Sequence, residues 1–393
     1  MNVLMVLDGV FPFDERVEKE AMSLIEQGYE VHLLCFRYSK KTDENEVYKN
    51  IHIHRIYVNR WIIKKLHPIL FYTHHYSIIL YNKTVFYIKK YNIKILHVHD
   101  LPLCSLAHRI KNNIPIRYIA DLHENFPELI STMSYMNFYT KFLIRIEKWY
   151  AMEQKWLQNT DRVLVTARGM KERISRSASV HNNKITILEN TIKTEDYTLS
   201  SVVPDPDFFT LLYTGGITAD RGLDVVLDAM KLIQKEHSHI RFWIIGSGKH
   251  LPALMNRKKE LELKNVTFFG WKPAREMFQL MLQSDAGVIP HLKSEHTDNT
   301  SPNKIFQYFY AKKPVLASNC NYLVDIIEET RAGLNYEYDN PLDFFQKLKN
   351  MIFDENYKGM GQKGYQAVIN KYNWKITEKN LINCYSEIYP DYR

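Results

Sequence analysis

The chain has 393 residues, of which 45% are hydrophobic and 24% charged, and its formal net charge is +8. These values exclude an intrinsically disordered protein, and the length exceeds what a single hydrophobic core usually holds. The positive charge favours anionic partners such as phosphates or acidic lipid head groups. Nucleic acid is not expected as a partner, because the sequence has no arginine-rich block and no nucleic-acid-binding motif.

Cysteine usage and hydropathy predict a protein of the reducing cytoplasm. The cysteines are far apart and form no metal-binding spacing, so we expect buried free thiols at Cys35, Cys104, Cys320 and Cys384. The apolar residues 3–7 begin the chain without the pattern of a signal peptide. No apolar run reaches the about 18 residues that a membrane-spanning helix needs.

The first half of the chain alternates apolar strands with amphipathic helices. Apolar runs without polar alternation are typical of a parallel sheet that is covered on both faces. A helix is predicted at 16–27, and strands at 1–8, 31–36, 51–58, 95–100, 117–124, 162–166 and 185–190. Residues 191–207, which include Pro204 and Pro206, are predicted to link the two halves.

Two of these predicted strands end in acidic residues next to histidines. His99 and Asp100 end one strand, and His123 and Glu124 end the other. Ligands of open α/β sheets bind beyond the carboxyl ends of the strands, so these side chains are candidates for chemistry. The alternative is that they are structural, and the sequence leaves both interpretations open.

Residues 60–91 are rich in lysines and aromatic residues. A helix with this composition can lie on an anionic membrane surface through Lys64, Lys65, Lys83, Lys89 and Lys90. The alternative is a pair of core-facing helices whose lysines are solvated.

The second half repeats the alternation, with glycine-rich turns after its strands. Strands are predicted at 208–213, 240–245, 266–269 and 286–289 and near residues 315–318, with a final helix at 374–389. Gly215 and Gly216 allow the backbone to approach a ligand, and Arg221 can bind phosphate oxygens. Neither the dinucleotide fingerprint nor the phosphate-loop motif is present, which disfavours an NAD enzyme and an ATPase.

The stretch from Asp298 to Tyr308 is typical of a helix start. Polar residues precede Pro302, which predicts a side-chain cap with proline in the first helical position. The free amides of such a terminus form a site for phosphate, and Lys304 in the first turn indicates a bound anion. The alternative is an ordinary capped helix.

These motifs occur in the same order in family 4 glycosyltransferases, and the chain resembles that family over nearly its whole length. Residues 11–17 and 121–128 are similar to loops of members that assemble bacterial surface polysaccharides such as capsule or lipopolysaccharide. The resemblance implies a retaining transferase of the hexosyltransferase type with the GT-B fold. It predicts two Rossmann-like domains, 1–190 and 191–373, facing across a cleft, and a C-terminal helix, 374–393, packed back on the first domain.

The resemblance also implies the roles of individual residues. Arg221 and Lys304 would neutralise the diphosphate of a nucleotide-sugar donor, and His123 would contact the transferred sugar. Trp271 would frame the base and Gln307 would meet the ribose. The other donor-binding positions are Gly9 in a loop closing over the donor, Gly215, Gly216, Gly248, Thr300, Ser301, Pro302 and Asn303. No metal or further cofactor is expected, and the acceptor would be a glycan or a polyprenol-linked glycan, which places the protein at the inner face of the cell membrane.

The sequence departs from the family pattern at two acidic positions. Asn299 and Gln307 stand where the family has paired glutamates, and Arg221 lacks its usual lysine partner. An active transferase is the main interpretation, because His123 and Lys304 are present together with Arg221. The alternatives are a non-catalytic subunit that binds sugar nucleotides or acts as a scaffold, and a sugar-nucleotide epimerase of the same fold.

Overall fold

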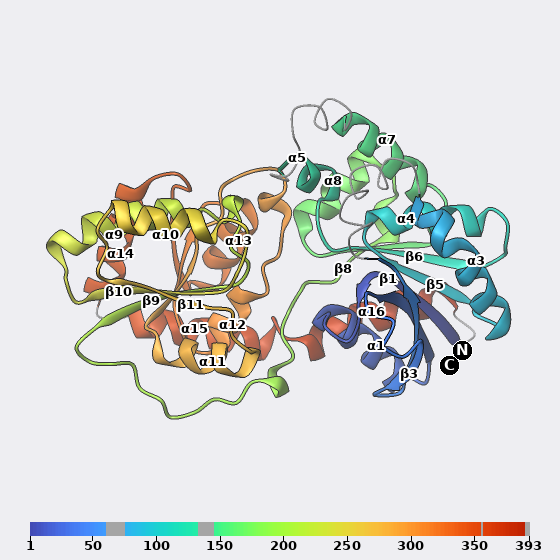
Figure 1. The fold of residues 1–393 in the computed structure, drawn as a ribbon, viewed down its shortest axis with the longest axis horizontal. Helices are drawn as coiled ribbons and strands as arrows, with labels where there is room; N and C mark the ends of the chain where they lie inside the picture. Colours follow the sequence, from blue (N-terminus) through green and yellow to red (C-terminus); the bar gives the residue numbers. More distant parts are fainter. Residues whose placement is uncertain (60–74, 133–144, 355–356, 390–393) are drawn as a thin grey trace. The chain divides into compact units, whose positions relative to one another are not determined.

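The computed structural model describes residues 1–59, 75–132, 145–354 and 357–389 (Figure 1). The chain divides into two compact units. Unit 1 comprises Met1–Glu189 together with Thr377–Arg393, and unit 2 comprises Asn190–Ile376. Each unit is built on a largely parallel sheet flanked by helices, so the predicted α/β class is confirmed.

Unit 1 contains an eight-stranded sheet with the strand order β3-β4-β2-β1-β5-β6-β7-β8. All of its strands are parallel except β3, which runs antiparallel to β4. The strands are β1 (Asn2–Val10), β2 (Glu30–Arg37), β3 (Asn45–Tyr48), β4 (Ile51–Tyr57), β5 (Ile95–His99), β6 (Arg117–Leu122), β7 (Arg162–Val165) and β8 (Ile185–Ile187).

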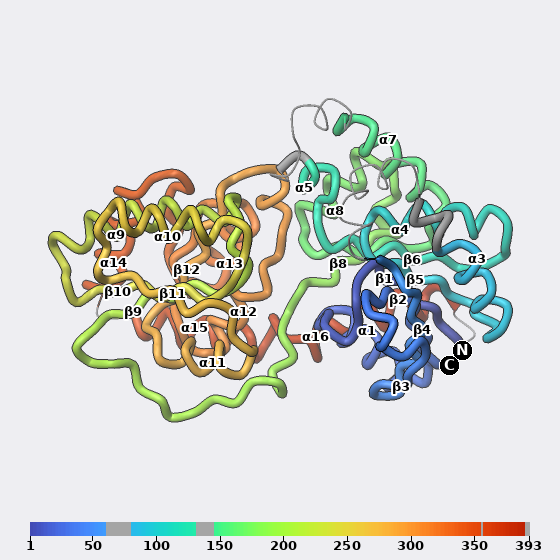
Figure 2. The backbone as a smooth tube through the Cα atoms, in the orientation of Figure 1, coloured from blue at the N-terminus to red at the C-terminus, as the bar shows by residue number. Residues whose placement is uncertain are grey.

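Helices cover this sheet, and the last helix of the chain belongs largely to unit 1. They are α1 (Glu15–Glu26), α3 (His75–Lys90), α4 (Leu101–Lys111), α5 (Phe126–Thr132), α7 (Ile146–Leu157), α8 (Arg168–Ser177) and α16 (Trp374–Ile388). Helix α1 begins where the Asp14 carboxylate accepts two backbone N–H groups of its first turn. Helix α16 lies beside α1 (Figure 2), where the Ser23 hydroxyl donates to Glu378 at 2.5 Å.

Unit 2 contains a six-stranded parallel sheet with the order β11-β10-β9-β12-β13-β14. Its strands are β9 (Phe209–Thr214), β10 (Ile240–Ile245), β11 (Val266–Gly270), β12 (Ala286–Ile289), β13 (Val315–Ser318) and β14 (Gly333–Tyr336). In Figure 1, α9 (Leu223–Glu236), α10 (Leu251–Glu260) and α14 (Pro341–Phe353) lie on one face, where their buried side chains share one core. On the other face lie α11 (Ala274–Gln283), α12 (Lys304–Tyr310) and α15 (Tyr357–Asn370), and α13 (Asn321–Thr330) packs beside α15.

Several predicted strand boundaries in unit 1 were wrong, and those of β1 and β6 bear on Gly9 and His123. Strand β1 continues to Val10 through an irregularity in its pairing with β2, so Gly9 lies in the strand and not in a loop. Strand β6 ends at Leu122, which makes His123 the first residue beyond it. The His123 side chain lies beside Asp100, the residue that follows neighbouring β5, with Nδ1 3.5 Å from Oδ2.

The structure also bears on the predictions about the cysteines and about membrane-spanning helices. All four cysteines are buried and free, as predicted. Within the described residues, no helix combines the length and hydropathy that a membrane crossing requires.

Candidate active site

The predicted donor-binding residues of unit 2 lie along one edge of its sheet. Because the strands are parallel, the turns that follow neighbouring β11, β10, β9 and β12 open at the same edge. Trp271 follows β11, Gly248 follows β10, and Gly215 and Gly216 follow β9. The segment 300–304 comes after β12 and leads into α12. The structure therefore brings together turns that lie far apart in the sequence.

The ammonium group of Lys304 is the most unusual charge at this edge. Lys304 is only 9% exposed, and its Nζ lies 4.2 Å from the centre of the Tyr213 ring. Among the described residues, no carboxylate lies within ion-pair distance of this nitrogen. Burial, together with the nearby Arg221 guanidinium, holds the pKa of Lys304 well below its usual range. An anion at this point would relieve both effects.

Gly215 provides the space in which the Lys304 ammonium lies. Its φ of +127° is a backbone conformation that other residues rarely adopt, and a Cβ there would lie 2.8 Å from Nζ of Lys304. The next residue, Gly216, accepts a hydrogen bond from the Tyr213 hydroxyl at 2.6 Å through its carbonyl. The absence of a side chain at Gly215 thus leaves room for the Lys304 ammonium, and the close approach of a ligand to this glycine pair stays a prediction.

Arg221 is the second cation of this site, and a neutral histidine orients it. Arg221 ends the short helix η3 (Ala219–Arg221), and its Nη1 donates to Nε2 of His291 at 3.0 Å. Burial, and then the charges of Arg221 and Lys304, hold the pKa of His291 well below its usual range, so the ring stays neutral and accepts. Asp220 is the nearest acid, 3.5 Å from Nε of Arg221.

The predicted side-chain cap at the start of α12 was wrong. The helix begins at Lys304 behind Asn303, without a capping side chain, and Pro302 precedes the helix. The hydroxyl of Thr300 donates to the His296 carbonyl at 2.7 Å, and that of Ser301 to the Tyr322 hydroxyl at 2.8 Å. A carbonyl of the preceding turn and a tyrosine of α13 therefore accept the two hydroxyls that the local pattern assigned to capping.

Several backbone amides of these turns remain available to a ligand. In the part of the chain that the structure describes, no acceptor is bonded to the N–H groups of Gly216, Ser301, Asn303 or Lys304. Backbone N–H groups beside two cations are suited to phosphate oxygens.

The remaining residues predicted to bind the sugar donor differ in their exposure, packing and hydrogen bonds. Trp271 is 70% exposed, as a residue that frames a base could be. A Cβ on Gly248 would lie 2.0 Å from the Ile217 carbonyl oxygen, so this glycine is required for the packing of two loops. The amide of Gln307 is buried and donates to the Tyr197 hydroxyl at 2.8 Å, while that of Asn299 donates to the Glu295 carbonyl at 2.7 Å. Contact of Gln307 with a ribose stays a prediction.

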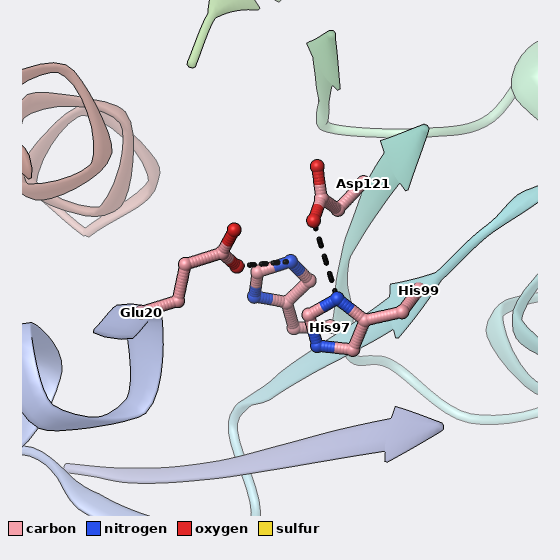
Figure 3. A group of neighbouring side chains, drawn as sticks. All are labelled: Glu20, His97, His99 and Asp121. Atoms are coloured by element: carbon pink, nitrogen blue, oxygen red, sulfur yellow. Dashed lines mark hydrogen bonds and ion pairs between the residues drawn. The ribbon is translucent and has the colours of Figure 1, made fainter. Parts of the chain in front are cut away.

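His123 in unit 1 belongs to a buried cluster of charged groups. Its Nε2 lies 2.7 Å from Oδ2 of Asp121, and its Nδ1 lies 3.5 Å from Asp100. Arg16 binds the Asp121 carboxylate through Nε at 3.1 Å and Nη2 at 2.7 Å. Figure 3 shows part of the cluster, with His99 bonded to Asp121 from the neighbouring strand. Helix α1 and strands β5 and β6 thus converge on Asp121.

Burial and neighbouring charged groups determine the protonation states of the side chains in this cluster. Burial alone lowers the pKa of His123, but Asp100 and Asp121 outweigh it and raise the pKa to about 10. Burial and then Asp121 raise the pKa of Glu20 to about 8, while burial lowers the pKa of His99. Near neutral pH, therefore, His123 and Arg16 are charged, and Glu20 is protonated.

Four residues of the cluster are of metal-binding types. One ligand atom each from Glu20, His97, His99 and Asp121 lie within 4.8 Å of one another (Figure 3). However, the Arg16 guanidinium lies 3.0 Å from Glu20 and bonds both oxygens of Asp121. Because a dication would have to share these carboxylates with Arg16 and the charged His123, the donor set fits an arginine better than a metal.

Other predicted residues lie near His123 at the strand ends. Asp8 precedes Gly9 in β1, and burial together with Asp100 raises the pKa of Asp8 to about 7. Asp100 has a φ of +70°, which is uncommon for a residue with a side chain, and its carboxylate accepts the backbone N–H of His123 at 3.1 Å. A Cβ on Gly9 would meet only its own strand neighbour Leu7, at 3.5 Å, so the structure gives no packing reason for this glycine.

Glu20→Gln is expected to stabilise the protein at mildly alkaline pH. The folded protein keeps the Glu20 proton up to about pH 8, whereas the unfolded chain releases it near its usual pKa of 4.5. Wild-type stability therefore falls as the pH rises through this window, and glutamine removes that dependence. We expect a gain on the order of 2 kcal/mol at pH 8 that vanishes near pH 4.5.

Calorimetric unfolding of both proteins between pH 4.5 and 8.5 measures this difference. The exposed Glu26 on the same helix gives a matched control, Glu26→Gln, which makes the same substitution outside the buried cluster. A constant difference between Glu20→Gln and wild type across the range would contradict the assigned protonation state.

Comparison with known proteins identifies the chain. The family model described as Glycosyltransferase Family 4 matches residues 16–196, and the model described as Glycosyl transferases group 1 matches residues 209–354. The chain is a family 4 glycosyltransferase. Its transferase activity follows from both halves, since each half matches a glycosyltransferase model.

Relatives of this glycosyltransferase carry the same description. An uncharacterised glycosyltransferase of Methanocaldococcus jannaschii is 22% identical over 361 residues, which cover 91% of this chain and 90% of the relative. The capsular polysaccharide biosynthesis glycosyltransferase CapM of Staphylococcus aureus is 20% identical over 249 residues, which cover 60% of this chain and 64% of the relative.

Solved structures confirm the GT-B fold predicted for this glycosyltransferase. Sucrose-phosphate synthase of Thermosynechococcus elongatus superposes with a TM-score of 0.81 over 99% of both chains at 14% identity. Anabaena Alr3699/HepE, solved in complex with UDP, superposes with a TM-score of 0.72 at 11% identity, over 98% of this chain and 99% of that one.

Proposed function

We propose that this glycosyltransferase moves a sugar from a nucleotide-diphosphate sugar, with retention, to a glycan or polyprenol-linked acceptor in surface-polysaccharide biosynthesis. The observation that carries the proposal is the buried Lys304 ammonium, which has a second cation beside it and no anionic partner among the described residues. The complex of HepE with UDP supports a nucleotide donor, and the similarity to CapM, a capsular polysaccharide biosynthesis glycosyltransferase, supports the polysaccharide pathway.

Transfer requires that the departing diphosphate be stabilised more strongly than the bound donor. As the sugar–oxygen bond breaks, negative charge grows on the β-phosphate. Lys304 and Arg221 would neutralise this charge, and the free amides of Gly216 and Ser301 would donate to its oxygens. Since Lys304 is already desolvated, its attraction for the developing charge is not weakened by water.

The other half of the reaction concerns the transferred sugar and the acceptor. We assign His123 to the sugar, as the resemblance implies, and the leaving phosphate to deprotonation of the acceptor hydroxyl on the same face. No metal ion is proposed. The cations Lys304 and Arg221 would neutralise the diphosphate, and Arg16 neutralises the buried carboxylate of Asp121 in unit 1.

The alternative of a non-catalytic subunit is favoured by one observation. Asn299 and Gln307 replace the paired glutamates, and the amides of both are bonded within the protein. A non-catalytic subunit or a scaffold would bind the donor without turnover, and an epimerase would convert the donor without any acceptor. Conversion of the donor that depends on the acceptor distinguishes the active transferase from both.

A donor screen tests the proposal. Thermal unfolding is followed with UDP-, GDP- and dTDP-sugars, and the stabilising donors are then incubated with and without polyprenol-linked acceptors. We expect a rise in Tm for one donor series, since a ligand at 100 times its Kd stabilises by about 2.7 kcal/mol. The product should appear only with acceptor. Donor conversion without acceptor, or binding without conversion, would overturn the proposed transfer.

We also propose that the enzyme works at the cytoplasmic face of the membrane. Lys64 and Lys65 lie outside the described residues; Lys83, Lys89 and Lys90 are exposed on α3. The Lys83 ammonium lies 3.7 Å from the Glu44 carboxylate, which weakens the attraction of Lys83 to an anionic surface. Each lysine that reaches an anionic surface contributes about 1 kcal/mol.

Co-sedimentation with phosphatidylglycerol-containing vesicles tests this placement. We expect binding at low salt, loss at high salt, and a several-fold weaker interaction for Lys89→Glu combined with Lys90→Glu. Lys358→Glu with Lys363→Glu, at exposed positions of α15, serves as the matched control. Equal binding of the two double variants, or none by the wild type at low salt, would contradict the membrane assignment.

A further inference from the structure

Both ring nitrogens of His123 face carboxylate oxygens. Nε2 lies 2.7 Å from Oδ2 of Asp121, and Nδ1 lies 3.5 Å from Oδ2 of Asp100. The backbone N–H of the same residue donates to Oδ1 of Asp100 at 3.1 Å, which fixes the second carboxylate in place. A neutral imidazole has only one N–H, so one of its nitrogens would turn a lone pair toward an anion. Protonation of both nitrogens satisfies both contacts.

Asp121 is held as an anion from the opposite side. It is fully buried, and the guanidinium of Arg16 binds both of its oxygens, at 3.1 Å and 2.7 Å. Arg16 is itself fixed by the Leu188 carbonyl at 3.0 Å, and Nδ1 of His99 lies 3.2 Å from Oδ2 of Asp121. A paired arginine strongly favours the charged carboxylate.

The charged groups that face His123 favour its protonated form. The anionic groups that face it are Asp121 on β6 and Asp100 beyond β5, with Asp8 on β1 titrating near neutrality. Helix α1 supplies the cation Arg16 and the protonated Glu20. The imidazoles of β5, His97 and His99, are buried and neutral. Two carboxylates, Asp121 and Asp100, thus face His123 beside a single guanidinium, and a proton on His123 adds a second positive charge to the group.

We propose that Asp121, anchored by Arg16, is a positioning residue that keeps His123 doubly protonated and fixes its ring. His123 then meets its substrate as a permanent cation and takes up no proton during the reaction, so it is not the base that activates the acceptor. The cation would suit an electron-rich oxygen of the transferred sugar, and this last statement rests on the proposed function. The charge state of His123 stands independently of it.

Nitrogen-15 NMR of the histidine side chains in the full-length protein tests the charge state without substrate. We expect both nitrogens of His123 to remain protonated at pH 8, and the exposed His181 provides a reference signal in the same spectra. In Asp121→Asn, His123 should lose a proton below pH 8, and Asp121→Glu should restore the wild-type signal. Where Asp121→Asn does not fold, Asp100→Asn removes the other carboxylate and should also lower the titration midpoint.

Kinetics supply the second readout once a donor and an acceptor are known. In Asp121→Asn, turnover should fall by at least about tenfold at pH 8 and recover toward pH 6, where His123 is protonated again, with KM for the donor little changed. A neutral His123 at pH 8 in the wild type would overturn the proposal, as would an equal loss of turnover at both pH values. If NMR shows the imidazolium but no transfer is found, the proposed function alone fails.

Discussion

Lys304→Met is expected to weaken nucleoside diphosphate binding and to stabilise the unliganded protein. The loss of a charge-assisted phosphate contact costs about 1.5–3 kcal/mol, or about 10–150-fold in Kd. The gain in stability arises because an ammonium that is 9% exposed, without a carboxylate partner in the described parts of the chain, is replaced by an apolar side chain of similar length. That gain should be on the order of 1 kcal/mol.

The opposite signs of the two effects make this a specific test. Calorimetric titration gives the affinity, and thermal unfolding without ligand gives the stability. Lys312→Met, at an exposed position just beyond the other end of α12, is the matched control and should change neither. Arg221→Gln should weaken binding by a similar factor, since it removes the second cation. An unchanged Kd in both site variants would rule out this edge of the unit 2 sheet as the diphosphate site.

His123→Gln is expected to lower turnover by about 100–1000-fold and to leave nucleotide affinity within about twofold. The cation lies in unit 1, whereas Lys304 and Arg221 lie in unit 2, so the two measurements report on separate groups of residues. Glutamine keeps one N–H donor toward Asp121 but carries no charge, so the experiment isolates the charge of His123.

Steady-state kinetics and nucleotide titration, each at pH 7.5, measure the two quantities. His181→Gln, at an exposed position of the same unit, is the control and should behave as wild type. Equal losses of turnover and nucleotide affinity, accompanied by a lower Tm, would assign His123 a structural role instead.

The fold could be predicted from the sequence where strands are buried and therefore apolar. Strands such as β10 and β12 are apolar, and they were predicted at their observed bounds. The sequence did not reveal β3 or β14. Three of the four residues of β3 are exposed at an edge of the sheet, and β14 is a four-residue strand of mixed burial. Pairing with a neighbouring strand defines both, and a local pattern does not record such pairing.

Part of the candidate site could also be predicted from the sequence. Glycine turns and cations after strands indicated Gly215, Arg221 and Lys304, because all parallel strands open their turns at one edge. His291, which orients Arg221, has no local signal, since it is one polar residue in a long loop. The role of Arg16 was equally hidden, because Arg16 lies on helix α1 and its partner Asp121 lies 105 residues away on strand β6. Such partners appear only when the sheet order is known.

A crystal structure of the protein with the nucleoside diphosphate selected by the donor screen would locate the diphosphate site. We expect the β-phosphate at the edge of the unit 2 sheet, with its oxygens within hydrogen-bond distance of the Lys304 ammonium, the Arg221 guanidinium and the Gly216 amide. A nucleotide bound at full occupancy with its phosphates away from Lys304 and Arg221 would contradict this expectation.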